Sequence, residues 1–303
     1  MGEAQPGAAH CSFGVAGSPI ADSLSPLLHH AAAARLGLRD FSYGRVELTA
    51  ERLEGWLDAQ PGLRGLSLTM PLKHRLVELA RSRGWVPDAA VEATGAANTL
   101  LLDPDTGMGE ILNTDVAGIV AAIREGAEVS DGAGDRTAVW DEVDVLGAGA
   151  TAGSALAAAA ELGATRAQLF VRNRTRAAAA REVAEAVGIR AVVRDLPDWV
   201  PGERALTLST LPAGAMGPGG VDHPLPAAIP GIVFDAGYAP AARGWQESLR
   251  AHGALVVDGS RMLLHQAVAQ HVRFAALAGL PAGRAEAARA DVRAAMDAAL
   301  RSR

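Results

Sequence analysis

The stretch DEVDVLGAGATAGSALAAAAELGATRAQLFVRNRTR, residues 141–176, decides the fold of the second half of the chain. An apolar run of strand length, residues 143–146, leads directly into Gly147-Ala148-Gly149-Ala150. The alanine-rich residues 151–162, beginning with Thr151, predict a helix that stops at Gly163, and residues 168–171 predict a second strand. The stretch is therefore a predicted β-α-β unit with a glycine-rich first turn.

That turn has the composition of a dinucleotide-binding loop. Gly147 permits the tight turn, and Gly149 lets the backbone approach a pyrophosphate whose charge then lies at a helix N-terminus. With Ala152 or Gly153 as the third small residue, the spacing fits the G-x-G-x-x-G pattern in the expected strand-turn-helix context. The alternative is a tight turn without a ligand.

The residues after the second strand indicate which dinucleotide is bound. In NAD-binding units this strand usually ends in an acid that bonds the ribose 2′-hydroxyl. Here it is followed by Arg172-Asn173-Arg174-Thr175-Arg176. Guanidinium groups cannot accept a hydrogen bond from that hydroxyl, but they bind a 2′-phosphate in a bidentate manner. The sequence therefore predicts NADP as the cofactor.

Composition limits the class of protein. The chain has 303 residues, 49% of them hydrophobic, which is enough for two domains with separate cores. The formal net charge is -6, which argues against a nucleic-acid surface and favours small-molecule chemistry. The single cysteine, Cys11, excludes an internal disulfide and a cysteine metal cluster, and we expect it to be a small buried residue. We also see no signal peptide or membrane-spanning run, and expect a cytoplasmic protein.

The first part of the chain alternates predicted strands and helices. We expect a mixed, mostly parallel sheet with helices on both faces. Its predicted strands are 11–16, 41–47 and 63–69, with a hairpin-like pair at 96–102 and 109–112. Its predicted helices are 26–36 with Ser25 as N-cap, a segment from Thr49 to residue 59, one starting at Pro71, and one from Asn113-Thr114-Asp115 to residue 124.

The second part continues as an α/β domain. A polar connection, residues 125–140, leads into the quoted unit, and further strands are expected at 191–194, 204–209, 231–235 and 254–257. Helices are expected at 176–187, 241–252, 259–279 and 284–300. We predict a catalytic domain of residues 1–118, completed by helices in 259–303, and a Rossmann-type NADP-binding domain of residues 119–258.

Several motifs together resemble those of shikimate dehydrogenases, in the forms of the actinobacterial branch. They occur in the family's order over nearly the whole chain: residues 17–26 (GSPIADSLSP), 67–73 (SLTMPLK), 95–99 (GAANT), 113–115 (NTD), 147–150 (GAGA), 173–175 (NRT) and 259–266 (GSRMLLHQ). The resemblance implies two α/β domains and the reversible reduction of 3-dehydroshikimate to shikimate with NADPH, in the pathway to chorismate and the aromatic amino acids.

The resemblance also implies roles for individual residues. Lys73 and Asp115 match the catalytic pair, and Ser23 and Ser25 match the hydroxyls that hold the substrate carboxylate. Other implied substrate contacts are Thr69, Asn98, Tyr238 and Gln266. The implied cofactor contacts are Gly147, Ala148, Gly149, Ala150, Thr151, Asn173, Arg174, Thr175, Arg176, Ala236 and Gly259.

Several of these residues also have a simpler structural explanation. A lone lysine or aspartate is usually a solvated surface charge, and a mid-helix glutamine such as Gln266 is more often at the surface. Asn113-Thr114-Asp115 and the two serines are also typical of helix caps. No metal site is predicted, because the adjacent His29 and His30 do not share a helix face.

The chain departs from the family pattern at some positions, which leaves the substrate open. Asp22 stands where a histidine is usual, and Ser67 replaces the commoner asparagine. The alternatives are a quinate or aminoshikimate dehydrogenase, since an acid attracts an amino substituent, or a non-catalytic dinucleotide-binding regulator. Monomer and homodimer are both compatible with the sequence.

Overall fold

The computed structural model describes residues 12–103, 105–130, 140–212, 214–216 and 223–302. It divides into two compact units. The first comprises Met1–Asp88, Ala97–Leu112 and Ala267–Arg303, and the second comprises Ala89–Ala96 and Asn113–Gln266. The chain thus changes unit at 112/113 and 266/267, whereas the predicted domain limits are 118/119 and 258/259. Cys11 lies outside the described residues.

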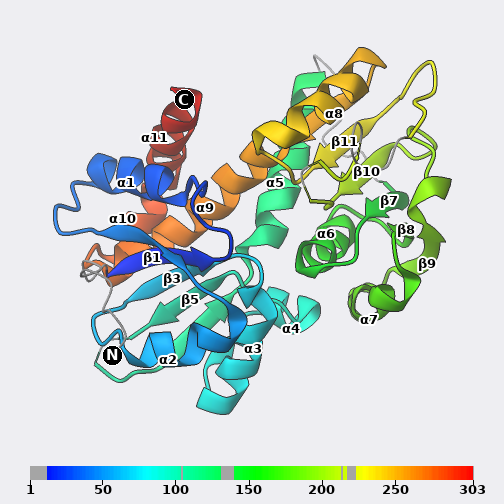
Figure 1. The fold of residues 1–303 in the computed structure, drawn as a ribbon. Helices are drawn as coiled ribbons and strands as arrows, with labels where there is room; N and C mark the ends of the chain where they lie inside the picture. Colours follow the sequence, from blue (N-terminus) through cyan, green and yellow to red (C-terminus); the bar gives the residue numbers. More distant parts are fainter. Residues whose placement is uncertain (1–11, 104, 131–139, 213, 217–222, 303) are drawn as a thin grey trace, which may run out of the picture. The chain divides into compact units, whose positions relative to one another are not determined.

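The first unit is built on a six-stranded mixed sheet of order β2-β1-β3-β5-β6-β4 (Figure 1). Its strands are β1 (Phe13–Gly17), β2 (Tyr43–Glu47), β3 (Gly65–Leu68), β4 (Val86–Pro87), β5 (Thr99–Leu102) and β6 (Gly109–Leu112). Pairing is parallel except at β3–β5 and β5–β6, so β5 runs opposite to its neighbours. This confirms the predicted mixed, mostly parallel sheet and the hairpin of β5 with β6.

Helices lie on both sides of this sheet. They are α1 (Ser25–Leu36), α2 (Leu53–Asp58) after the short 3-10 turn η1 (Ala50–Arg52), α3 (Leu72–Arg83), the C-terminal part of α9 (Gly259–Leu277), α10 (Ala282–Ala287) and α11 (Arg289–Arg301). Figure 1 shows α1 on one side of β1 and β3, and α2 and α3 on the other.

The face of the sheet toward α9 is closely packed. Phe13, Tyr43, Leu101 and Phe274 are buried there. A Cβ atom at Gly65 would lie 2.6 Å from the Phe274 ring, so glycine is required where α9 crosses β3. The backbone of β3 and the side chains of α9 are therefore in direct contact.

The prediction that Ser25 caps α1 is wrong. The helix begins at Ser25, its N-cap is Leu24, and Pro26 lies in the first turn, where a missing N–H costs nothing. The Ser23 hydroxyl instead accepts a hydrogen bond from the Ser25 N–H at 3.4 Å. The first serine therefore takes the capping role that we expected of the second.

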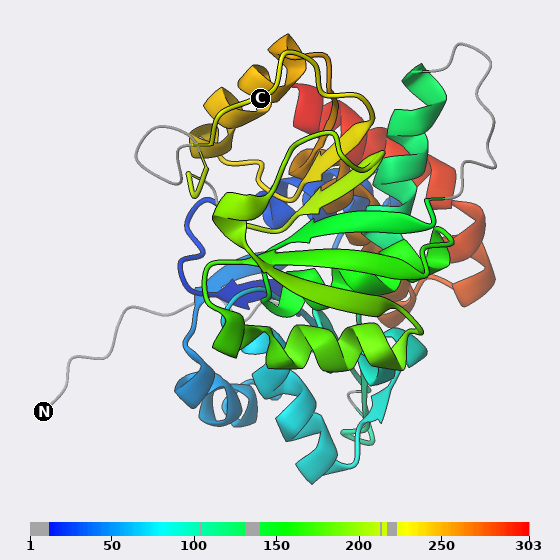
Figure 2. The same ribbon diagram turned by 90° about the vertical axis from the view of Figure 1, so that its right-hand side faces the viewer.

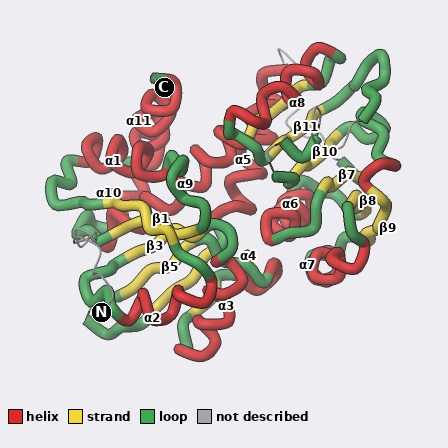
Figure 3. Tube along the Cα trace, viewed as in Figure 1, coloured by secondary structure: helices red, strands yellow, loops and turns green. Residues whose placement is uncertain are grey.

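The second unit is a parallel six-stranded sheet of order β9-β8-β7-β10-β11-β12. Its strands are β7 (Glu142–Leu146), β8 (Arg166–Val171), β9 (Arg190–Asp195), β10 (Leu206–Ser209), β11 (Ile232–Asp235) and β12 (Leu255–Asp258), and its helices include α4 (Ala89–Thr94), α5 (Thr114–Ser130), α6 (Ala150–Glu161), α7 (Ala178–Ala186) and α8 (Pro240–Ala251). Figure 2 shows these strands side by side, and Figure 3 shows them alternating with helices. Counted along the chain, the order is 3-2-1-4-5-6, the Rossmann order that we predicted.

The two faces of this sheet pack against different helices. Val143 and Val145 of β7 are buried with residues of α5, α6 and α7, whereas Leu146 is buried with Trp199 and with Trp245 of α8. The alternation along β7 is that of a strand covered on both faces.

Two predicted boundaries are wrong. Residues 125–130 belong to α5 and not to a connection. Gly126 indicated a break, but a Cβ atom there would lie 2.3 Å from Val257 Cγ2, so this glycine allows α5 to pass close to β12. The predicted last helix, 284–300, is divided at Ala288 into α10 and α11, because Ala285 packs against α9 while α11 packs against α1. The short β4 and α4 were not predicted.

Candidate active site

The predicted substrate residues of the first unit gather at one edge of its sheet. Thr69 follows the end of β3, Lys73 lies in the first turn of α3, and Asn98 precedes β5. Because β5 is antiparallel, with Thr99 opposite Ser67, its beginning lies at the edge where β1 and β3 end. Thr69 and Lys73, which follow β3, and Asn98, which precedes β5, therefore lie at the same edge as the end of β1. Open α/β sheets place their sites at such edges.

Backbone contacts fix these segments to one another. The Leu68 N–H donates to the Asn98 carbonyl at 2.7 Å, and the Ala97 N–H donates to the Lys73 carbonyl at 3.1 Å. At Gly17 a Cβ atom would lie 2.3 Å from Thr69 Cγ2, so only glycine lets the end of β1 pass beside Thr69. The position of Thr69 thus depends on a residue 52 positions earlier in the chain.

The loop that carries Ser23 is held by β2. The guanidinium group of Arg45 donates to the Ser23 carbonyl at 3.0 and 2.7 Å, and the Glu47 carboxylate accepts from the Ile20 N–H at 2.9 Å. The sequence analysis did not predict a role for Arg45 and Glu47. These two charged residues alternate with Val46 and lie on the same face of β2 as Tyr43, which is the sequence feature that could have identified them. Ser25 is buried, Ser23 is half-buried, and Asp22 is exposed.

The segment before α5 combines helix capping with burial. The Asn113 Oδ1 atom accepts from the Asp115 N–H at 3.1 Å, which confirms the capping explanation for Asn113. Its Nδ2 atom donates to Thr94 Oγ1 at 2.9 Å and to Ser154 Oγ at 3.1 Å. Asp115 is 4% exposed and so is not a solvated surface charge. Its predicted pairing with Lys73, which belongs to the first unit, stays a prediction.

Gln266 is buried and not at the surface. Its Nε2 atom donates to the Leu263 carbonyl at 3.0 Å, and its Oε1 atom lies 3.4 Å from the Thr114 hydroxyl. A Cβ atom at Gly118 would lie 3.0 Å from Gln266 Cβ, which shows that α5 and α9 pack closely here. Within the second unit, the structure therefore brings Gln266 beside the Asn-Thr-Asp segment.

The glycine-rich turn has the expected geometry. Gly147 has φ +110°, and a Cβ atom there would lie 2.6 Å from Thr210 Oγ1. Gly149 is the N-cap of α6, with Ala150 and Thr151 in its first turn, and no described atom lies within 4 Å of its Cβ position. Open space at the N-terminus of a helix fits an approaching phosphate. Ala148, between the two glycines, is half-buried.

The arginine-rich segment after β8 is exposed, from Arg172 to Arg176. Asn173 caps the 3-10 turn η2 (Arg174–Ala177), accepting from the Thr175 N–H at 2.9 Å and from its hydroxyl at 2.6 Å. The Arg174 guanidinium makes a bidentate pair with Asp195, with both distances 2.8 Å. Asp195 is exposed, and its hydrogen bonds with Arg174 lower its pKa. Arg174, which we predicted to bind the 2′-phosphate, is thus already paired with an acid.

Two residues predicted to contact the cofactor meet after β11. A Cβ atom at Gly259 would lie 2.1 Å from the Ala236 carbonyl oxygen, so glycine is required where α9 begins. The neighbouring Asp235 is buried, which raises its pKa, and Gln246 donates to its carboxyl group at 2.9 Å and to the Gly237 carbonyl at 2.8 Å. Tyr238 is 39% exposed. The structure thus fixes Ala236 and Gly259 together and leaves the Tyr238 ring accessible.

Metal ligation and membrane insertion find no support among the described residues. In them, His, Cys, Asp and Glu form no group of three or more that is suited to hold a metal ion. None of the described helices combines the length and hydropathy of a membrane span.

Comparison with known proteins gives a consistent set of relatives. The family model for the shikimate dehydrogenase substrate binding domain matches residues 15–100. The shikimate dehydrogenase (NADP(+)) of Caulobacter vibrioides is 35% identical over 261 residues, which cover 84% of this chain and 86% of the relative.

Solved structures extend the likeness over nearly the whole chain. The shikimate dehydrogenase of Mycobacterium tuberculosis has a TM-score of 0.74 and 31% identity, covering 96% of this chain and 99% of that one. The shikimate 5-dehydrogenase of Thermus thermophilus, solved in complex with NADP(H) and shikimate, has a TM-score of 0.68 and 30% identity, covering 95% and 98%.

Proposed function

The chain belongs to the shikimate dehydrogenase family, and we propose that it catalyses the reversible NADPH-dependent reduction of 3-dehydroshikimate to shikimate. This step lies on the route to chorismate and the aromatic amino acids. The observation that carries the proposal is that Thr69, Lys73 and Asn98 gather at one sheet edge, and that Arg45 and Glu47 of β2 hold the loop of Ser23, directly before Ser25 and α1. We also propose that the protein acts in the cytoplasm, as a monomer or homodimer, and binds no nucleic acid.

The second unit fits NADP. Gly147 and Gly149 leave the N-terminus of α6 open to a pyrophosphate, and Arg172, Arg174 and Arg176 offer exposed guanidinium groups to a 2′-phosphate. When bound, NADP+ accepts a hydride and NADPH donates one. The remaining proposed cofactor contacts are Ala148, Ala150, Thr151, Asn173, Thr175, Ala236 and Gly259.

Side chains of the protein must bind the carboxylate of the substrate and accept or donate the proton of its hydroxyl group. The Ser23 and Ser25 hydroxyls, at the N-terminus of α1, would donate to the carboxylate, whose charge is also favoured by the helix dipole. In the oxidative direction the substrate alcohol loses a hydride from carbon and a proton from oxygen. We assign acceptance of that proton to Lys73 Nζ, and orientation of the lysine and the hydroxyl to Asp115.

A steady-state assay with shikimate, quinate and an aminoshikimate, each with NADP+ and NAD+, tests the function. We expect kcat/KM to be highest for shikimate with NADP+. Equal or better turnover of quinate would overturn the choice of substrate. Preference for the amino compound would make Asp22 a specificity residue, and NADPH binding without turnover of any of these acids would indicate a regulator.

Lys73→Ala tests the mechanism. Because a positioned acid-base group contributes on the order of 10² in rate or more, we expect kcat to fall by about that factor while KM for NADP+ is unchanged. Arg75→Ala is the control and should keep kcat, since it removes another cation of the same helix, one that pairs with Glu54 and Glu78. Near-normal turnover by Lys73→Ala would remove Lys73 from the mechanism.

A further inference from the structure

A chain of buried hydrogen bonds within the first unit runs from Tyr43, beside the helix that carries Ser25, to Asn98; Ser25 and Asn98 are both predicted substrate contacts. The Tyr43 hydroxyl donates to Ser67 Oγ at 2.7 Å, and the Ser67 hydroxyl donates to Gln270 Oε1 at 2.9 Å. Gln270 Nε2 donates to Thr99 Oγ1 at 2.9 Å, and the Thr99 hydroxyl donates to Asn98 Oδ1 at 2.8 Å.

Tyr43 also packs against the helix that carries Ser25. Its ring is stacked on that of His29 of α1, with ring centroids 4.2 Å apart, and Ser25 lies one helical turn before His29. Burial raises the pKa of Tyr43, and the Ser67 and Ser25 side chains partly offset this effect. Ser25 and every member of the chain are 6% exposed or less, so water does not compete for these bonds.

The position of these residues in the fold explains the arrangement. Tyr43, Ser67 and Thr99 are on the sheet face covered by α9, as the pairing of their strands shows. Gln270 projects from α9, one helical turn before the buried Phe274. The amide of a single residue thus links β3 to β5.

The bonds have a fixed direction at Gln270. Its oxygen accepts from Ser67, and its nitrogen donates to Thr99 and, at 3.3 Å, to the Asn98 carbonyl. Because the Thr99 oxygen accepts a hydrogen bond from the Gln270 amide, the Thr99 hydroxyl is left to donate to Asn98 Oδ1. The orientation of the Asn98 amide, and so the face on which it offers its NH2 group, depends on Gln270.

We propose that Tyr43, Ser67 and Gln270 are positioning residues for substrate binding, acting through the Ser25 hydroxyl and the Asn98 amide. The proposal rests on the function proposed above, in which a carboxylated cyclohexene polyol contacts both side chains. When Ser25 donates to the carboxylate, the Tyr43 hydroxyl is the neighbouring donor that can turn to the Ser25 oxygen. Such chains are strengthened cooperatively by a charge at one end.

Three variants test this role. Gln270→Met keeps the side-chain volume and removes both polar ends. Gln270→Glu keeps the acceptor for Ser67 but offers Thr99 an acceptor in place of a donor, which reverses the Thr99 bond and releases the Asn98 amide. Tyr43→Phe removes only the hydroxyl. Arg273→Met, on the same helix and directed to an ion pair with Glu110 outside the chain of bonds, is the control.

The wild-type assay with shikimate and NADP+ comes first, because absence of turnover there contradicts the proposed function and not this inference. Given turnover, we expect each of the three variants to raise KM for shikimate by about 5-fold or more, the scale of a lost hydrogen bond. KM for NADP+ should stay within 2-fold, and Arg273→Met should match the wild type.

Unchanged KM for shikimate in well-folded Gln270→Glu and Tyr43→Phe would overturn the proposal. Equal increases in both KM values, or a Gln270→Met variant that alone is impaired in proportion to its lower melting temperature, would indicate a merely structural role and would also overturn it. If Gln270→Met does not fold, Tyr43→Phe still decides between these outcomes.

Discussion

At the scale of single residues, Arg174 is already paired where we expect it to bind phosphate. Its guanidinium fork faces both oxygens of Asp195, the same bidentate geometry that a 2′-phosphate would use. A 2′-phosphate of the cofactor would therefore compete with the Asp195 carboxylate for the Arg174 guanidinium group.

Two substitutions separate these partners. Asp195→Asn should lower the Kd for NADPH by up to about five-fold, the scale of an exposed ion pair, and leave that for NADH unchanged. Arg174→Ala should weaken NADPH far more than NADH. Fluorescence titration of both cofactors provides the measurement; equal losses in Arg174→Ala would mean that Arg174 does not contact the 2′-phosphate.

The sequence predicted some site residues better than others for a physical reason. Gly147 and Gly149 belong to a local pattern whose strand-turn-helix context lies within a few residues. The role of Gln270 depends on contacts with Ser67 and Thr99, which are 203 and 171 positions away, and that of Tyr43 on a contact 24 positions away; only packing creates these contacts. Gln266, taken alone, looked like a surface glutamine because its burial depends on α5.

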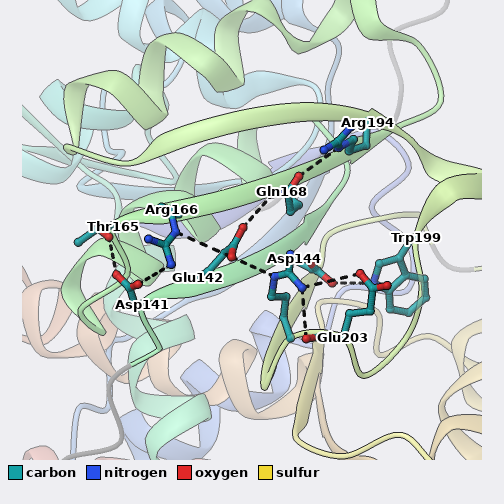
Figure 4. Close-up of polar contacts among 10 residues, drawn as sticks. Asp141, Glu142, Asp144, Thr165, Arg166, Gln168, Arg194, Trp199 and Glu203 are labelled. Carbon is teal, nitrogen blue, oxygen red and sulfur yellow. Dashed lines mark hydrogen bonds and ion pairs between the residues drawn. The ribbon is translucent and has the colours of Figure 1, made fainter.

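At the scale of elements, β7 carries a carboxyl group on its buried face. Trp199 Nε1 donates to Asp144 Oδ2 at 3.1 Å, while Glu142 pairs with Arg204 at 3.3 Å and lies 3.8 Å from Arg166 (Figure 4). Burial raises the pKa of Asp144 to about 7. Neutral Asp144 is therefore the form that this strand favours.

This shift gives a pH dependence of definite sign. Between pH 4 and 7 the folded protein keeps a proton on Asp144 that the unfolded chain releases, so the contribution of Asp144 to the free energy of unfolding falls as pH rises through this window. Asp144→Asn should abolish that slope and keep the bond from Trp199. Urea unfolding at pH 5, 6 and 7 measures it. Asp141→Asn, at an exposed neighbour paired with Arg166, is the control, and an unchanged slope in Asp144→Asn would refute the assignment.

The elements themselves were largely predictable, and the errors have a common cause. Apolar residues located the strands of both sheets except the short β4, since each of these strands buries at least one face. Gly126 was misinterpreted because a glycine that ends a helix and one that lets a helix approach a strand look alike in sequence. The division at Ala288 depends on two packing partners, α9 and α1, which local pattern does not reveal.

At the scale of the whole molecule, buried groups of the two compact units should contribute to the pH dependence of stability with opposite signs. His29 and His271 are buried in the first unit with their Nδ1 atoms 3.1 Å apart. Burial lowers the pKa of His271 to about 4, and burial and the neighbouring His271 lower that of His29. The sequence predicted two domains but not this pair, which joins α1 to α9.

The histidine pair should make the protein less stable as the pH is lowered. Below about pH 6.5 the histidines of the unfolded chain bind protons, whereas the buried pair stays neutral. The contribution of the pair to the free energy of unfolding therefore decreases from pH 6.5 toward pH 4. His271→Gln should reduce this loss between pH 7 and pH 5, measured by urea unfolding. His252→Gln, at the end of α8 where the ring bonds the Ser248 carbonyl, should retain it. Identical slopes in both variants would contradict the prediction.

The reversed direction of β5 has a practical consequence for labelling the enzyme. Since β5 begins at the edge that carries Asn98, the turn that joins it to β6 lies at the far end of the hairpin. Met108 in that turn is exposed, and Gly107 already has a left-handed φ of +69°. A fluorophore, an affinity tag or an inserted peptide attached there would be one strand length away from Asn98. This turn is therefore a suitable site for immobilising the protein while turnover is followed.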